Sequence, residues 1–143
     1  MREILFRGKR IDNGEFTEGF FFKEYSTFYR KFSYTIQYQN KFGMPIANYE
    51  IDPETVGQFT GLTDKNGKKI FEGDIVAQNW YVHDEPSDDS VGEVVFCEYD
   101  CSFSVMETNK DGIVPLGRCH AYHWEAEVIG NIHDNPELLE NSQ

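Results

Sequence analysis

Proline, cysteine and basic residues are scarce in this chain, and a long apolar run is absent. The 143 residues include five prolines and three cysteines. No apolar run approaches the ~20 residues that a membrane-spanning helix needs. Residues 1–7 contain neither an extended apolar stretch nor a small-residue cleavage site, so we expect no signal peptide. An odd cysteine count without an export signal favours free thiols in a reducing cytoplasm.

Positive charge is scarce and unevenly placed. The chain has 13 Lys and Arg against 25 Asp and Glu, a net charge of −12. Residues 1–41 hold eight basic and five acidic residues, so the remaining residues carry the whole excess of negative charge. Because phosphate attraction supplies most non-specific affinity for nucleic acid, this acidity argues against a nucleic-acid partner. It favours solubility and a basic or neutral partner.

Catalytic signatures are also missing. The chain has no Gly-x-Ser-x-Gly elbow, no phosphate-binding glycine-rich loop and no His-Glu-x-x-His motif. The sequence therefore predicts a protein that is not an enzyme and needs no cofactor, and a metal-dependent enzyme is the last of the alternatives.

Aromatic residues are abundant, at 15% of the chain, and they favour strands. Residues 33–38 and 122–129 alternate between apolar and polar side chains, as half-buried strands do. Hairpin turns are predicted at residues 12–14, at Asn66-Gly67 and at Gly73-Asp74. Only single helical turns are predicted, after Asp52-Pro53 and after Asn135-Pro136. Residues 83–90 are polar and acidic and predict a mobile loop. The fold class is therefore all-β.

Three segments of the chain form a recognisable set. The longest is DPETVGQFTGLTDKNGKKIFEGDIV at residues 52–76; FRGK at residues 6–9 precedes it, and VIGNIHDNPELL at residues 128–139 follows it. Together these segments resemble the YopX-like family of phage and prophage proteins. The resemblance implies a phage or prophage origin, hence the cytoplasm of a bacterial host, and it assigns no catalytic residues. It also implies an SH3-like small β-barrel in the C-terminal part. We therefore expect an N-terminal β-hairpin lobe at residues 1–53 and the barrel, with a short C-terminal helical turn, at residues 54–143.

One group of residues has the chemistry of a metal site: Cys97, Cys101, Cys119, His120 and His123. Zinc needs such side chains to converge, most often from a Cys-x-x-Cys spacing. Cys97 and Cys101 miss that spacing, and on one continuous strand their Cα atoms would lie ~13 Å apart. Only a hairpin turning at residues 98–100 would bring them opposite each other. We favour cysteines that serve as small hydrophobic side chains, and no metal.

Two acidic patterns could also bind a metal ion, and each has a simpler interpretation. His123, Glu125 and Glu127 would share one face of a strand and could hold a metal, although such alternation is typical of the wet side of a sheet. The acids of residues 84–89 lack the ordered spacing and central glycine of a calcium loop, so a solvated segment is the better interpretation.

The N-terminal part offers the candidate interaction surface. Phe20, Phe21 and Phe22 are consecutive, so a strand would point them to both faces, and a small lobe can rarely bury both. We expect a protein partner, either a second copy in a homo-oligomer or another phage or host protein. The alternative is a binder of single-stranded nucleic acid, through basic residues interleaved with aromatic rings. These residues are Arg2, Arg7, Lys9, Arg10, Arg30, Lys31 and Lys41, with Phe6, Phe16, Tyr29 and Phe32.

Overall fold

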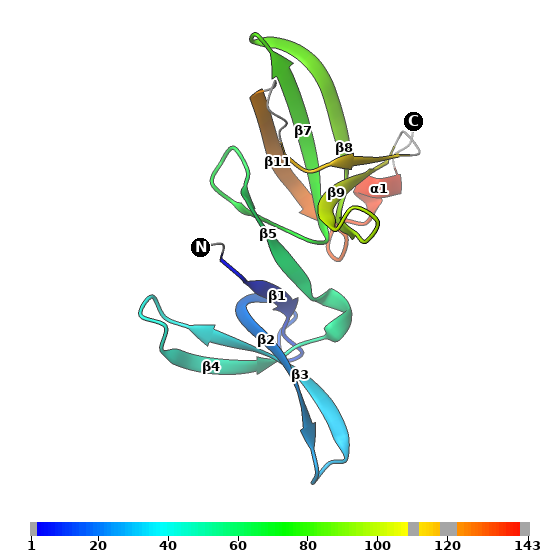
Figure 1. Cartoon of the computed structure of the whole chain (residues 1–143). Coiled ribbons are helices and arrows are strands. Elements are labelled where there is room, and N and C mark those ends of the chain that lie inside the picture. The colour runs from blue at the N-terminus through cyan, green and yellow to red at the C-terminus, as the bar shows by residue number, and fades with distance from the viewer. Residues whose placement is uncertain (1–2, 109–111, 118–122, 141–143) are drawn as a thin grey trace. The chain divides into compact units, whose positions relative to one another are not determined.

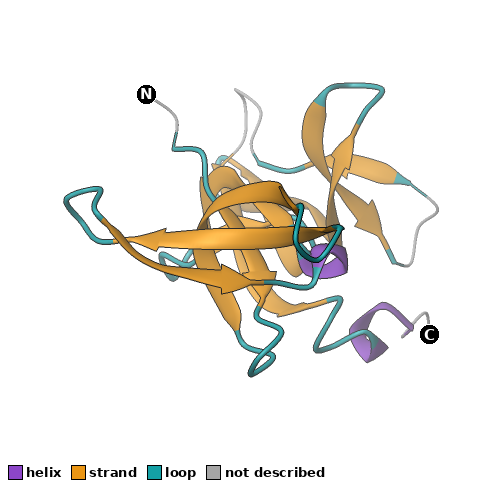
Figure 2. Cartoon of the chain, turned by 90° about the horizontal axis from the view of Figure 1, so that it is seen from below, coloured by secondary structure: helices purple, strands orange, loops and turns teal. Residues whose placement is uncertain are grey.

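The computed structural model describes residues 3–108, 112–117 and 123–140 of the chain. The prediction of an all-β protein is confirmed, since strands make up most of the described residues and only two short segments are helical (Figure 2). No helix among the described residues is long and apolar enough to cross a membrane. The chain divides into two compact units, Met1–Phe59 and Thr60–Gln143. The sequence placed this boundary six residues earlier, between residues 53 and 54.

The first unit contains five strands and one 3₁₀ turn. They are β1 (Phe6–Lys9), β2 (Phe16–Ser26), β3 (Lys31–Gln39), β4 (Pro45–Glu50), η1 (Pro53–Thr55) and the first half of β5 (Gly57–Thr63). The strand order is β4-β3-β2-β1-β5, and every pairing within it is antiparallel (Figure 1). Ile36 and Ile51 are completely buried in this unit. The predicted turn after Asp52 forms η1, and the Asp52 carboxylate accepts a hydrogen bond from the backbone N–H of Glu54.

The second unit is built around a curled five-stranded sheet. Its elements are the second half of β5, β6 (Lys69–Phe71), β7 (Asp74–Val82), β8 (Glu85–Cys97), β9 (Ser102–Glu107), β10 (Ile113–Pro115), β11 (His123–Asn131) and α1 (Glu137–Glu140). The sheet order is β10-β9-β8-β7-β11. Ile70, Val76, Val94, Val105 and Ala126 form its core, and Trp124 and Val128 pack against them on the face predicted for residues 122–129.

A glycine marks the point where a long strand changes partner, once in each unit. β2 pairs with β1 up to Gly19 and with β3 from Phe20 onward. β8 pairs with β7 along its first half and with β9 from Gly92 onward. A Cβ atom at Gly19 or Gly92 would overlap the backbone carbonyl oxygen of Gln37 or Met106. Only glycine allows the backbones to approach this closely.

Each of the two turns predicted in the second unit contains a glycine with a positive φ. Gly67 follows Asn66 with φ of 82°, and Gly73 has φ of 88°. The backbone N–H of Gly73 donates to the carbonyl of Val94 at 2.9 Å, which ties this turn to β8. The adjacent Asp74 is buried, and its carboxylate accepts a hydrogen bond from the backbone N–H of Phe71 at 2.8 Å.

Asp64 joins the turn between β5 and β6 to a distant strand. One carboxylate oxygen accepts from the backbone N–H groups of Asn66 and Lys68, each at 2.9 Å, and the other accepts from Val128 of β11 at 3.0 Å. Burial, which leaves only 7% of Asp64 exposed, pushes its pKa upward, but the backbone donors together with the Lys68 charge outweigh burial. The pKa of Asp64 is therefore lower than its ordinary value.

The prediction of a mobile loop over residues 83–90 is wrong. Residues 85–90 belong to β8, where Val82 pairs with Glu85 across a two-residue turn. The turn residues His83 and Asp84 have φ of 51° and 65°, the left-handed conformation that a tight hairpin needs at both positions. Cross-strand pairing with β7 thus orders a segment whose composition alone suggested solvation.

Candidate interaction surface

The end of the β2–β3 hairpin stands clear of the other strands in its unit. β1 covers β2 only as far as Gly19, and β4 pairs with β3 only from Thr35 onward. Residues 24–26 therefore pair with residues 31–33 and with no other described strand. In Figure 1 this end of the hairpin points away from β1 and β4. Both hydrogen-bonding edges of the hairpin end are accordingly unpaired with any other described strand.

One face of the hairpin carries a continuous aromatic stripe. Antiparallel pairing places Phe21 beside Ile36, Lys23 beside Tyr34, and Tyr25 beside Phe32. The Phe21 and Tyr34 rings stack with centroids 6.2 Å apart, and the Tyr25 and Phe32 rings meet edge to face at 5.0 Å. Such cross-strand aromatic pairs stabilise the hairpin by ~0.2–1 kcal/mol each. The stripe therefore begins beside the buried Ile36 and becomes more exposed toward the tip.

Lysine occupies the middle of the stripe. The Lys23 ammonium lies 4.1 Å from the Phe32 ring centroid and 5.6 Å from that of Tyr34. A cation over aromatic faces is attracted by their negative electron density. This position gives the stripe a positive charge between its rings, so the surface is both apolar and cationic.

The hairpin tip adds two further aromatic side chains and two cations. Phe28 and Tyr29 are neighbours in the turn, with ring centroids 4.9 Å apart, and Arg30 and Lys31 follow them. Tyr25, Phe28, Tyr29 and Phe32 are between 53 and 85% exposed. We call these four residues, together with Lys23, Arg30 and Lys31, the hairpin surface. Glu24 is the one acid among residues 23–32, and it lies on the face of the hairpin opposite to Lys23. Lys31, which pairs with Ser26, lies on the same face as Glu24.

The turn itself is held in an unusual backbone conformation. The Ser26 hydroxyl accepts a hydrogen bond from the backbone N–H of Tyr29 at 3.1 Å. Arg30 has φ of 53°, which is uncommon for a residue other than glycine. The turn thus places a long cationic side chain where glycine or asparagine would be the ordinary choice.

The structure distributes the predicted phenylalanines over both faces of β2. Phe21 belongs to the aromatic stripe and is half-buried against Phe6, at a centroid distance of 5.7 Å. Phe20 and Phe22 lie on the opposite face, where Phe20 is 51% exposed and Phe22 is half-buried. Tyr25 and Phe28 were not singled out from the sequence. The period-two spacing of Phe21, Lys23 and Tyr25 was the available signal.

The basic residues proposed for nucleic-acid binding come from three separate segments of the first unit. Arg7, Lys9 and Arg10 lie on or beside β1, Arg30 and Lys31 lie at the β2–β3 turn, and Lys41 lies in the β3–β4 turn. Phe6 and Phe16 are half-buried on β1 and β2, and Arg7 lies over the Phe16 ring at 4.5 Å. Arg2 is outside the described residues.

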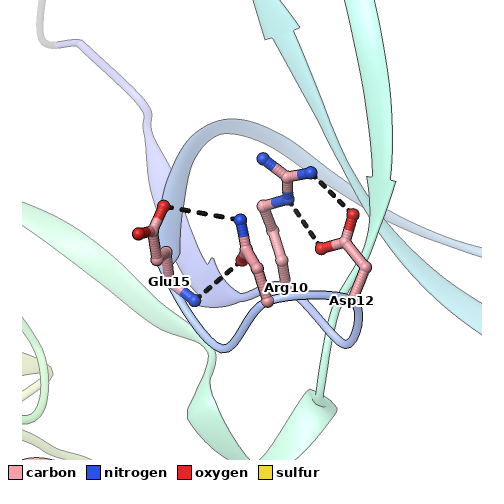
Figure 3. A network of polar contacts seen from close by, with 4 residues as sticks. Arg10, Asp12 and Glu15 are labelled. Atoms are coloured by element: carbon pink, nitrogen blue, oxygen red, sulfur yellow. Dashed lines mark hydrogen bonds and ion pairs between the residues drawn. The ribbon is translucent and has the colours of Figure 1, made fainter.

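Arg10 has local partners of its own. Its guanidinium donates two hydrogen bonds to the Asp12 carboxylate, at 2.9 and 2.6 Å (Figure 3). It also lies 3.9 Å from the Tyr49 ring centroid. The hydrogen bond to Asp12 raises the pKa of Arg10, and the same bond lowers the pKa of Asp12. This pair neutralises one of the cations that a phosphate backbone would need.

The predicted metal-like group is only partly described. A hairpin does turn at residues 98–101, but it pairs Cys97 with Ser102 and leaves Cys101 exposed with φ of 54°. Both cysteines are free thiols. Within residues 3–108, 112–117 and 123–140, no three His, Cys, Asp or Glu side chains gather as metal ligands would. Cys119 and His120 lie outside these residues.

His123 lies on the exposed side of β11. Its Nε2 atom is 3.4 Å from a carboxylate oxygen of Glu125, and Glu127 approaches the Lys65 ammonium to 3.5 Å. Ion pairs this exposed contribute little to stability. The alternating set therefore forms surface pairs, as the wet side of a sheet does.

The described features define an all-β protein of two units, whose first unit exposes a cationic aromatic hairpin. The family model described as "YopX protein" matches residues 6–140. The chain therefore belongs to the YopX family. No curated protein matches the chain significantly.

Proposed function

We propose that this chain is a protein-interaction module of a phage or prophage, acting in the host cytoplasm, and that it binds its partner through the hairpin surface. The observation that carries the proposal is the run of exposed rings and cations along an otherwise uncovered hairpin. Exposed aromatic and arginine side chains are the residue types that contribute most to protein interfaces. The phage setting and the location in the host follow from the resemblance of residues 6–9, 52–76 and 128–139.

Aromatic rings on a hairpin also suit single-stranded nucleic acid, the second candidate. Stacking on exposed rings such as Tyr25 and Phe32 is sequence-tolerant and would combine with the nearby cations. Two observations favour a protein instead. The cations named from the sequence lie on separate segments, and the net charge of −12 opposes any polyanion.

A photo-crosslinking amino acid at the tip tests the proposal directly. We would place it at Phe28, which is 85% exposed, and as a matched control at Tyr99, which is 97% exposed in the β8–β9 turn. The proteins would be irradiated in bacterial cells in which the gene is expressed. We expect an adduct from position 28 that resists nuclease and has the added mass of a second protein, and no adduct from position 99.

The chemistry of the adduct separates the candidates. A nuclease-sensitive adduct at position 28 would replace the protein partner by nucleic acid. Equal adducts at both positions, or none at position 28, would contradict a specific role for the hairpin surface.

A further inference from the structure

The second unit carries a hairpin whose charge is opposite to that of the hairpin surface. Residues 74–97, which form β7 and β8, include no Lys or Arg and five Asp and Glu besides the buried Asp74. Residues 23–32, which form the end of the β2–β3 hairpin, include three basic residues and one acid. In physiological salt, exposed opposite charges attract each other over distances of up to about one Debye length, ~8 Å.

The acidic hairpin is also hollowed. Its pairing register shifts between Trp80 and Tyr81, so that Trp80 faces Asp88 and Tyr81 faces Pro86. A hollow of about 270 Å³ opens at this irregularity, and its lining includes Trp80, Tyr81, Asp88 and Asp89. Aromatic faces beside carboxylates attract guanidinium and ammonium groups by two means, the ring electrons and the negative charge.

We propose that the hairpin surface of one copy docks onto the acidic β7–β8 hairpin of a second copy, with Arg30 and Lys31 meeting Asp88 and Asp89. The inference rests on the proposed function, because it names the partner of the same surface. Charge complementarity carries it, since one chain supplies both a cationic aromatic tip and a hollow with aromatic and acidic walls. Every cell that expresses the gene contains this partner, because the partner is a second copy of the same chain.

The contact is heterologous, because different surfaces of the two copies meet. Heterologous contacts close into rings or continue as open chains, according to the rotation between neighbours. A contact made by one hairpin tip is smaller than the roughly 1,200 Å² of a stable interface, so we expect weak, reversible association. We also expect salt to weaken it, because both sides are exposed and charged.

A charge exchange between two purified full-length variants tests the proposal. One variant is Arg30→Glu/Lys31→Glu and the other is Asp88→Lys/Asp89→Lys. We expect sedimentation velocity, at roughly 5–200 µM protein and low salt, to show association of the wild type. Each variant alone should associate at least ~10-fold more weakly, and an equimolar mixture of the two should recover association.

A matched control removes the effect of net charge. Glu98→Lys/Asp100→Lys changes two exposed acids in the β8–β9 turn of the same unit and alters the net charge by the same amount as the Asp88 and Asp89 substitutions. We expect this control to associate as the wild type does. Thermal unfolding followed by circular dichroism establishes that each variant is folded before it is compared.

Three results would overturn the inference. They are a wild type that remains monomeric over the whole concentration range, variants that do not recover association when mixed, and a control that is weakened as much as Asp88→Lys/Asp89→Lys. A monomeric wild type that still gives a protein adduct from position 28 would refute self-association alone and leave the proposed function standing. A nuclease-sensitive adduct would refute both.

Discussion

Replacing Asp64 by asparagine should destabilise the second unit and change how its stability depends on pH. The carboxylate accepts three backbone N–H groups, two from its own turn and one from Val128 of β11. Asparagine keeps one oxygen, which can serve Asn66 and Lys68, but it presents an N–H₂ group to the Val128 donor. Because hydrogen bonds to a charged group contribute roughly 1.5–3 kcal/mol and an unpaired buried donor costs a similar amount, we expect a loss of about 2–4 kcal/mol.

The direction of the pH effect follows from the lowered pKa. A carboxyl group whose pKa is lower in the folded state than in the unfolded state stabilises the fold above its unfolded value, 3.8 for Asp64. That contribution is lost as the pH falls through the folded pKa. The difference in unfolding free energy between wild type and Asp64→Asn should therefore be full at neutral pH and shrink progressively below about pH 4.

Tryptophan fluorescence during urea unfolding measures this difference. The chain has two tryptophans, Trp80 and Trp124, and both belong to the second unit, as does Asp64. Asp100→Asn is the matched control, because it removes the same charge from an exposed turn of that unit. We expect it to change the unfolding free energy by less than about 0.5 kcal/mol. A loss in Asp64→Asn that is no larger than in the control, or that stays constant down to pH 3, would refute the reasoning.

Four further substitutions, one of which serves as a comparison, test individual features of the second unit. Gly92→Ala should lower the free energy of unfolding by about 1–3 kcal/mol or more, because the added Cβ overlaps the Met106 carbonyl. Gly67→Ala meets no neighbour and should lower it only by the ~1–2 kcal/mol that a left-handed backbone costs alanine. Thermal unfolding followed by circular dichroism compares the two variants. Gly73→Val should lose about 1–3 kcal/mol through strain at φ of 88°, and a melting temperature within a degree of wild type would contradict the turn. Burial raises the pKa of Glu93, so its ionised carboxylate destabilises the fold. Glu93→Gln should therefore raise the melting temperature at pH 7, and this gain should shrink toward pH 3.5, where the carboxyl group is protonated. An equal gain at both pH values would exclude the ionised carboxylate as its cause.

Local signals in the sequence predicted local structure well. Asn66-Gly67 predicted a turn because few other residue pairs accept left-handed backbone without strain. Asp52-Pro53 predicted the capped turn η1 because a side-chain oxygen, a fixed φ and a missing N–H suit the first turn of a helix. The alternation over residues 33–38 predicted β3, whose Ile36 is buried. In each case the interacting groups are within a few residues of one another.

Features that depend on distant partners were not predictable in the same way. Residues 85–90 have no apolar pattern, and they become a strand only because β7 pairs with them. The short strands β4 and β10 were not predicted either. Asp64 illustrates both cases, since its bonds to Asn66 and Lys68 follow from the turn sequence, whereas its bond to Val128 spans 64 positions.

The hairpin surface required the register as well as the sequence. Tyr29, Arg30, Lys31 and Phe32 stood out from the sequence as neighbours, but Tyr25 joins them only because it pairs with Phe32. Lys23 joins through its position over the Phe32 ring. A shift of one residue in the pairing would move every side chain of one strand to the other face and break the stripe.

The division of charge between the two units bears on what the hairpin surface can bind. Met1–Phe59 contains eight basic and eight acidic residues, so Thr60–Gln143 accounts for the whole net charge of −12. Of the 16 large apolar side chains exposed among the described residues, 11 lie in the first unit. Contact between two second units is opposed by repulsion, and contact between two first units gains no net attraction between charges. A first unit meeting a second unit combines apolar burial with charge attraction, which is why the contact we infer joins different surfaces of two copies.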